Sequence, residues 1–193
     1  MNKRIGILCI ILGFCCLLAS VGLVVYNRME AKNAETAAAE ILSDVQQITE
    51  AAEERPAEGD APREMAVADV DGNPCIGVLS IPVLELELPV LTDWSYEKLK
   101  TAPCHYYGSC YESDFVIAAH NYPAHFGRLS ELQSGDLVLF TDVSGEVRCY
   151  EAVLLETLPP EATLEMITSG FDLSLYTCTP GGGSRVTVRC NLK

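Results

Sequence analysis

The chain has 193 residues, with 27 acidic and 13 basic side chains and a formal net charge of −14. This length accommodates one ordinary domain with appendages and excludes two large domains. The charge argues against nucleic-acid binding, because no basic stripe is present, and it is typical of solubility on the outer side of a membrane.

The first predicted element is a membrane span. Residues 5–26, "IGILCIILGFCCLLASVGLVVY", carry no charge over 22 positions and follow Lys3 and Arg4. This length crosses a bilayer, whereas the apolar region of a cleaved signal peptide usually has about 7–15 residues. Positive charges before the span favour a cytoplasmic segment at 1–4, although Arg28 beyond the span weakens the asymmetry. We expect an uncleaved single-pass anchor in the cell membrane, with the rest of the chain extracellular.

Two segments connect this span to the folded domain. Residues 27–54 are rich in good helix formers, and their few apolar residues beyond alanine form one short cluster at Ile41, Leu42, Val45 and Ile48. We expect a helical stalk that is solvated on all sides. Residues 55–69 carry prolines, glycine and charges without periodicity, which is typical of a flexible linker. The folded domain is therefore expected at 70–193.

Short strand patterns separated by turn signals fill this domain. Apolar and polar residues alternate after Pro82, and "DFVIAAH" is a short apolar run that ends at His120. "GDLVLFTDVSGEVRCYEAVLLETL" predicts a hairpin, and "DLSLYTC" and "SRVTVRC" predict two strands joined by "TPGGG". The intervening "PPEATLEMITSG" predicts one or two helical turns that stop at Gly170. Strands at this spacing without long helices predict an all-β barrel or sandwich.

The nine cysteines divide between the span and the domain. Six lie where oxidation to disulfides can occur: Cys75, Cys104, Cys110, Cys149, Cys178 and Cys190. Cys104 and Cys110, in a segment resembling a loop, are the favoured pair. If Cys178 is a free nucleophile, at least two of the six thiols stay unpaired. A zinc site is disfavoured, because no CxxC occurs and the three histidines are scattered.

Three side chains with complementary chemistry stand at predicted strand ends. His120 ends "DFVIAAH", Cys178 ends "LSLYTC", and Arg185 begins "RVTVR". A thiol nucleophile needs an imidazole for proton transfer and a positive group for the substrate or the developing oxyanion. The strand ends of a rigid sheet can present such groups to one cleft. We therefore take these three residues as candidate catalytic residues.

Competing interpretations exist for the cysteine and the arginine. A cysteine outside a motif is by default a buried thiol or a disulfide partner, and Cys178 has this alternative. Arg189 competes with Arg185, because both project to one face of the strand under period-two alternation. The position of Arg185 at the start of the strand favours it.

The histidine also has two competitors. His125 lies five residues after His120, but it falls in a predicted loop after a proline. His105 lies in "PCHYYGSC" and is expected in a loop or on the surface. His120 is favoured because it ends a strand.

In this order, the segments resemble the sortases, membrane-anchored cysteine transpeptidases of Gram-positive bacteria. "IGVLSIPVLELELPV" is similar to the first strands of the family. "VIAAHNYPAHFGRLSELQSGDLV" resembles its histidine segment, and "LYTCTPGGGSRVTVR" resembles its cysteine segment. "TC" or "HN" alone has no specificity, but the ordered set after an N-terminal anchor is specific.

The resemblance implies a closed β-barrel of about eight strands with short helices, and a two-step acyl transfer. Cys178 would attack the threonine carbonyl of an LPxTG-like sorting signal and form a thioacyl enzyme. His120 would act as general acid and base. Arg185 would hold the substrate and stabilise the oxyanion, and Thr177 would contact the substrate. An amine of a cell-wall precursor or of another protein would resolve the intermediate.

Some features depart from the family pattern and leave the class open. Only six residues separate Cys178 from Arg185, and the 57 residues between His120 and Cys178 leave little room for the long helix of class B. An Asp-Pro-aromatic lid motif and a second hydrophobic span, which indicate class C, are not found. No cofactor is expected. Glu161 and Glu165 could offer oxygen ligands to calcium, but solvated surface charges are the favoured interpretation.

Two further functions remain open on the sequence alone. One is a catalytically silent sortase-like module that binds peptide. The other is an anchored structural β-domain whose external cysteines are all bridged. An ordinary cysteine protease is the closest enzymatic alternative, because water can replace the amine as acceptor.

Overall fold

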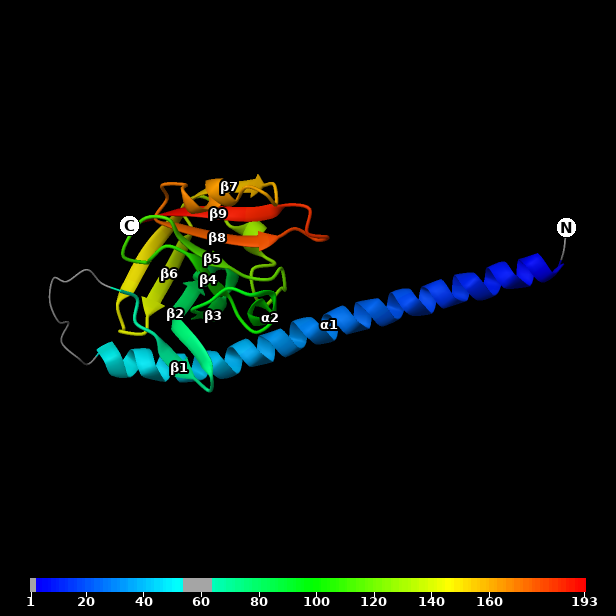
Figure 1. Ribbon diagram of the computed structural model, residues 1–193, viewed down its shortest axis with the longest axis horizontal. Coiled ribbons are helices and arrows are strands. Elements are labelled where there is room, and N and C mark those ends of the chain that lie inside the picture. Colours follow the sequence, from blue (N-terminus) through cyan, green and yellow to red (C-terminus); the bar gives the residue numbers. More distant parts are fainter. Residues whose placement is uncertain (1–2, 54–63) are drawn as a thin grey trace.

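The computed structural model describes residues 3–53 and 64–193 (Figure 1). Residues 1–2 of the predicted cytoplasmic segment, residue 54 of the predicted stalk and residues 55–63 of the predicted linker lie outside the described residues. A single helix, α1 (Lys3–Glu53), contains both the predicted span and the predicted stalk. Its apolar N-terminal part is long and apolar enough to cross a membrane, which makes it a candidate membrane anchor.

The domain is a closed β-barrel. Nine strands are found in the described residues: β1 (Ala68–Val70), β2 (Asn73–Ile81), β3 (Leu86–Leu91), β4 (Cys104–Tyr107), β5 (Phe115–Ala118), β6 (Leu137–Asp142), β7 (Val147–Leu158), β8 (Leu173–Cys178) and β9 (Arg185–Leu192). Their order is β1-β2-β3-β4-β5-β8-β9-β7-β6, and a further pairing of β2 with β6 closes the ring. Eight strands therefore form the barrel, and β1 pairs outside the ring with β2. The predicted fold class is confirmed.

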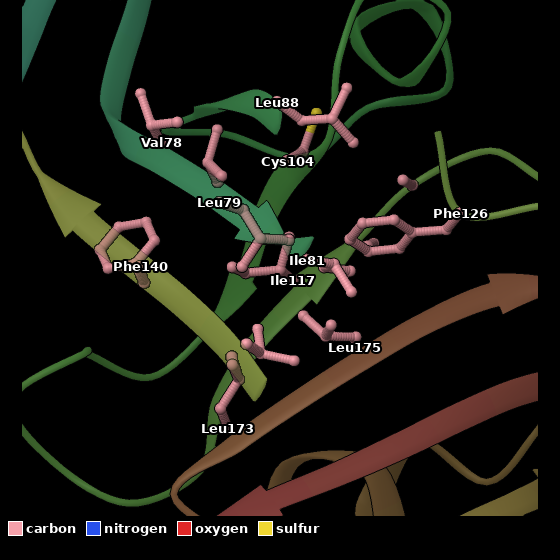
Figure 2. Close-up of a cluster of buried hydrophobic side chains, with 14 of the residues drawn as sticks. Val78, Leu79, Ile81, Leu88, Cys104, Ile117, Phe126, Phe140, Leu173 and Leu175 are labelled. Carbon is pink, nitrogen blue, oxygen red and sulfur yellow. The ribbon is translucent and has the colours of Figure 1, made fainter. Parts of the chain in front are cut away.

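Closure of the barrel depends on Gly77 in β2. Gly77 pairs with Asp142 of β6, and a register shift in β2 lies between Cys75 and Gly77. A Cβ atom at this position would overlap the carbonyl oxygen of Thr141. Only glycine permits this approach of the two backbones. Inside the ring, apolar side chains from strands on all sides meet in one core, as Figure 2 shows for Leu79, Ile117, Phe140 and Leu175.

Several predicted elements are present at their expected places. The "DVSGE" hairpin joins β6 to β7, and "TPGGG" joins β8 to β9. The helical turn before β8 is α3 (Thr163–Ile167), and Gly170 after it has a φ of 76°. Two more short helical elements, η1 (Pro82–Leu84) and η2 (Leu129–Glu131), occupy loops. The segment between His120 and Cys178 contains no helix longer than α3.

The expectation that "PCHYYGSC" is a loop is wrong for its first half. Residues Cys104–Tyr107 form β4, which joins the two halves of the barrel by pairing with β3 and β5. His105 belongs to this strand and is half-buried, and one of its ring nitrogens lies 2.8 Å from the carbonyl oxygen of Gly108. It is therefore a structural residue of the barrel wall.

The favoured Cys104–Cys110 disulfide is also wrong. Every cysteine of the chain is free, and all nine lie in the described residues. Both thiols are buried. The expectation of at least two unpaired external thiols is met.

The stalk is helical as predicted, but it is not solvated on all sides. A stripe on α1 is buried against β1, β2 and β3: Ala34, Ala38, Ile41, Val45 and Thr49. Its members are three or four residues apart, which places them on one face of the helix. Burying Ile41 and Val45 alone contributes roughly 3–6 kcal/mol by their transfer from water. The helix is therefore fixed to the barrel and is not a free spacer.

Candidate active site

Three adjacent strands bring the three candidate catalytic residues to one end of the barrel. β5 and β8 run parallel, with Ala118 opposite Tyr176, so His120 follows β5 at the height of Cys178. β8 and β9 run antiparallel, and Cys178 is paired directly with Arg185. In a sheet, residues at the same height on neighbouring strands point to the same face. The register therefore places all three residues at one strand edge, as the sequence predicts.

The turn that carries the thiol is short and internally hydrogen-bonded. The backbone N–H of Thr179 donates to the carbonyl oxygen of Ser184 at 2.9 Å, and the N–H of Ser184 donates to the hydroxyl of Thr179 at 3.0 Å. Gly181 and Gly182 have φ values of 85° and 75°, which side-chain-bearing residues rarely adopt. This closed turn holds the end of β8 against the start of β9.

Thr177 ties the cysteine strand to the histidine strand. It is 3% exposed, and its hydroxyl donates to the carbonyl oxygen of Ala119 at 2.8 Å. Ala119 directly precedes His120, so this bond fixes the relative height of the two strand ends. The predicted substrate contact of Thr177 stays a prediction, and the structure adds a positioning role for its hydroxyl.

The loop after His120 folds back on itself and fixes the histidine backbone. The N–H of Phe126 donates to the carbonyl oxygen of His120 at 3.1 Å, and the N–H of Gly127 donates to that of Tyr122 at 2.9 Å. A Cβ atom on Gly127 would lie 2.6 Å from the carbonyl oxygen of Asn121, so the loop requires glycine here. Phe126 is fully buried and points into the barrel core (Figure 2).

The His120 ring is close enough to charged groups of α1 and of the barrel for them to act on its pKa. Burial lowers the pKa of His120, the charge of Glu30 on α1 raises it, and Lys100 lowers it. Glu30 also lies 3.9 Å from Lys100, measured between carboxylate oxygen and ammonium nitrogen. The Nε2 atom of His120 is buried without a hydrogen-bond partner among the described residues. The protein therefore leaves this nitrogen uncommitted and favours the neutral imidazole.

His125 is fully buried in the structure. It is 0% exposed, and neither ring nitrogen makes a hydrogen bond of good geometry among the described residues, although the backbone of Ala34 on α1 lies near the ring. Burial, together with the nearby charge of His120, lowers its pKa to about 4. Tyr122 stands between the two histidines, with ring centroids 4.9 Å from His120 and 5.5 Å from His125. His125 therefore serves as a neutral packing residue under the loop after β5.

This burial predicts a pH-dependent loss of stability. The folded protein keeps His125 neutral, whereas the unfolded chain binds its proton below about pH 6.5. Stability present at pH 7 is therefore lost as the pH falls from 6.5 to about 4. By linkage, this one group accounts for about 3 kcal/mol of the loss. Urea unfolding of the full chain in detergent should show it.

The matched variant His125→Leu removes the titrating ring and keeps an apolar side chain. Its free energy of unfolding should fall less steeply between pH 7 and pH 4.5 than that of the wild type, with the carboxylates common to both. Parallel curves for the two proteins would contradict the assignment of a buried, neutral His125.

The two candidate arginines have different surroundings. Arg185 is half-exposed, and its guanidinium donates to the carbonyl oxygens of Gly182 and Ser184, both at 3.3 Å. Arg189 is 2% exposed and donates to the Glu156 carboxylate at 2.8 Å and to the Ser174 hydroxyl at 2.7 Å. Arg185 is thus available at the site, whereas Arg189 is committed to the barrel wall.

Arg189 also holds the segment before β8. Its guanidinium donates to the backbone carbonyl oxygens of Glu165 and Met166, at 2.8 and 3.3 Å. Glu165 was a candidate calcium ligand together with Glu161, and only its backbone takes part in this network. No group of three or more His, Cys, Asp or Glu side chains in residues 3–53 and 64–193 is arranged to hold a metal ion.

A cleft of about 200 Å³ opens beside Cys178. It lies between the turn after β8 and the loop after β5, and its walls are formed by Asn121, Phe126, Gly127, Ser130, Thr177, Cys178, Thr179, Pro180 and Val186. The candidate nucleophile Cys178 lines this cleft, whereas the wall from Asn121 to Ser130 was not predicted from the sequence. The apolar and polar lining beside a half-buried thiol is suited to an extended peptide.

Comparisons with known proteins agree with this geometry. The family model for the sortase domain matches residues 79–193. The chain is 26% identical to sortase C1 from Streptococcus agalactiae, with a TM-score of 0.56 over 65% of this chain and 70% of that one. It is 24% identical to sortase C-3 from Streptococcus pneumoniae, with a TM-score of 0.58 over 85% and 90%.

A match from another type shares the same fold. The chain is 17% identical to the sortase D5 transpeptidase of Clostridium perfringens, with a TM-score of 0.58 over 84% of this chain and 99% of that one. No curated protein sequence matches the chain. The family model spans more than half of the chain and includes every candidate site residue, so the chain belongs to the sortase family. Sortases are cysteine transpeptidases, and the described fold is theirs.

Proposed function

We propose that the protein is a membrane-anchored sortase that cleaves an LPxTG-type sorting signal after threonine and transfers the new carboxyl end to an amine. The observation that supports the proposal is the register of β5, β8 and β9, in which the end of β5 before His120 meets Cys178 and Arg185 at one strand edge, with Cys178 lining the cleft. The apolar part of α1 supports a single-pass anchor with the barrel outside the cell.

The first half-reaction forms the acyl enzyme. The Cys178 thiolate attacks the threonine carbonyl carbon, and the resulting oxyanion is stabilised by the Arg185 guanidinium. The carbon–nitrogen bond breaks, and the His120 imidazolium gives its proton to the leaving amine. The products are a thioester on Cys178, a neutral imidazole and the released C-terminal peptide.

The second half-reaction transfers the acyl group. An amine of a cell-wall precursor or of another protein attacks the thioester, and neutral His120 takes its proton. The carbon–sulfur bond breaks and restores the Cys178 thiolate beside the imidazolium. In the absence of an amine, water completes the same step, which would yield hydrolysis.

Incubation of the full chain in detergent with sorting-signal peptides and amines tests this proposal. Mass spectrometry should find an adduct of the peptide acyl group on Cys178 and an amide product with the amine. A peptide that binds without an adduct or product would instead support a silent binding module. A bridged Cys178 would support the structural alternative and contradict the enzyme.

The Arg185→Ala variant should lose transition-state stabilisation. Loss of one oxyanion-stabilising donor usually costs about 3 kcal/mol, which corresponds to roughly 100-fold in kcat/KM. Because Arg185 is half-exposed and its partners are backbone carbonyls of its own turn, the fold should persist. Arg185→Lys retains the charge and should recover part of the rate. Equal kcat/KM for wild type and Arg185→Ala would contradict the role.

Arg189→Ala is not a mild control for this experiment. The variant removes a buried charge and leaves Glu156 without its partner at 2.8 Å. Breaking a buried ion pair in this way typically costs about 3–5 kcal/mol of stability. Its main effect should therefore be a lower unfolding midpoint, in contrast to that of Arg185→Ala.

A further inference from the structure

The position of α1 against the barrel fixes the height of the barrel above the predicted span. Side chains of α1 are exposed from residue 6 to residue 29, and burial by the barrel begins at Glu30. Glu30 lies four residues after Tyr26, which is about 6 Å along an α-helix. The polar layer on each side of a bilayer is about 5–8 Å thick. Glu30 is therefore at the height of the lipid headgroups.

A short helix of the barrel lies near Glu30. Glu30 approaches Lys100, which directly follows α2 (Tyr96–Leu99), at 3.9 Å. In Figure 1, α2 lies beside α1 at the end of the barrel that faces the N-terminal half of the helix. β8 and the turn after it point to the same side.

Two aromatic side chains, one just before α2 and one at its first residue, are exposed. Tyr96 is 66% exposed and Trp94 is 38% exposed, and their ring centroids lie 5.1 Å apart. Trp and Tyr concentrate at membrane interfaces, because their rings are apolar and their N–H or O–H groups bind water and headgroups. Isolated exposed aromatics are common on soluble surfaces. This pair differs in lying on the segment that approaches Glu30 on the anchor helix of its own chain.

The charges around this pair are nearly balanced. Lys98 pairs with Asp93 at 3.0 Å, and Lys100 lies near Glu97 and Glu30. Attraction to anionic lipid is therefore weak, and the aromatic rings supply the affinity for the interface. Any lipid with a polar headgroup and a disordered acyl boundary can accept them.

The pair is joined to the strand of the nucleophile by stacked rings. Trp94 packs edge-on against Tyr106 at 5.8 Å, and Tyr106 packs edge-on against Tyr176 at 5.3 Å, both between ring centroids. Tyr176 lies two residues before Cys178 on β8. A surface held in the headgroup layer at Trp94 thus also sets the height of the cleft.

We propose that Trp94 and Tyr96 form a membrane-docking surface that inserts into the headgroup layer of the bilayer holding α1, so that the active-site end of the barrel faces the lipid. This inference rests on the anchor of the proposed function. It adds a second, peripheral contact to the same membrane and gives the cleft a fixed orientation toward the bilayer surface.

Trp94 is the only tryptophan of the chain, so its fluorescence reports this contact alone. The full chain is reconstituted into phosphatidylcholine vesicles with or without lipids brominated near the headgroup end of the acyl chain. An inserted Trp94 should lose about half of its emission to the bromine atoms, because interfacial aromatics sit at this depth. Added anionic lipid should change the quenching little.

A relocated tryptophan gives the matched control. Val147 is 52% exposed and begins β7, which runs parallel to β8, so it lies at the opposite end of the barrel from Cys178. The double variant Trp94→Phe/Val147→Trp should show no quenching by the same vesicles. Equal quenching of the two proteins would overturn the docking surface.

Flotation and alkaline extraction of the same vesicles distinguish a failure of the docking surface from a failure of the membrane anchor. Chain that stays with the vesicles after extraction while Trp94 is unquenched would overturn the docking surface and leave the anchor intact. Chain released by extraction would overturn both. Chain that is retained, with quenched Trp94 and an unquenched relocated tryptophan, is the result expected.

Discussion

Cys178→Ala is expected to abolish formation of the acyl enzyme completely, because no other thiol of the domain can take over. Burial raises the pKa of Cys75 and Cys110 to about 11 and that of Cys104 and Cys190 to about 12. Reaction requires the thiolate, so these four thiols are inert at neutral pH. Only Cys149 and Cys178 are partly exposed among the cysteines after residue 26.

A water-soluble maleimide makes this difference measurable. In the wild type, peptide mapping should find the label on Cys178 first, and preincubation with a sorting-signal peptide should slow the reaction. Cys149→Ala provides the matched control, since it removes the other partly exposed thiol and should leave acyl transfer unchanged. Transfer activity retained by Cys178→Ala would exclude the proposed mechanism.

The sequence predicted the barrel because each of its main strands carries its own pattern. The hairpin of β6 and β7 has a glycine-containing turn between two apolar runs, and β8 and β9 have the same arrangement. The strand β4 escaped prediction because it has only four residues, with prolines and glycines around it, and gains its order from β3 and β5. Its pairing is a tertiary property that local pattern does not contain.

The docking of α1 was missed for a similar reason. Two of the buried positions, Ala34 and Ala38, are alanines, which fit a solvated helix as well as a packed one. Their meaning depends on the surface of β1, β2 and β3 that covers them. The short apolar cluster around Ile41 and Val45 is visible in the sequence. The polar residues around it nevertheless favoured a helix solvated on all sides.

The positions of the three candidate residues at strand ends were predictable from the sequence, and the surroundings of the candidate site were not. His120, Cys178 and Arg185 could be chosen because each ends or begins a strand pattern, and the strand register brings them to one edge. The burial of His125 and Arg189 was not predictable, because a histidine in a loop and an arginine in a strand usually reach solvent. The proximity of Glu30 to His120 depends on the packing of α1 against the barrel, and no local sequence pattern indicates this packing.

His120→Ala is expected to lower kcat/KM by two to four orders of magnitude, the usual contribution of general acid–base catalysis. The imidazole has two tasks in sequence, since it protonates the leaving amine and then deprotonates the acceptor. His125 is not expected to replace it, because His125 is fully buried. His125→Leu is the matched control and should retain most of the activity at pH 7.5.

The pH dependence of kcat/KM in the wild type should also depend on His120. Catalysis needs thiolate and imidazolium together, so kcat/KM should be bell-shaped, with both limbs belonging to the coupled pair of Cys178 and His120. In a pair that rests as thiol and neutral imidazole, the lower of the two macroscopic pKa values follows the imidazole, so the burial that lowers the pKa of His120 should place the acidic limb below the ordinary imidazole value of about 6.5. The nearby Glu30 raises this pKa, so Glu30→Gln should move the acidic limb to still lower pH. An acidic limb that stays in place in Glu30→Gln and disappears in His125→Leu would show that the other histidine carries the proton.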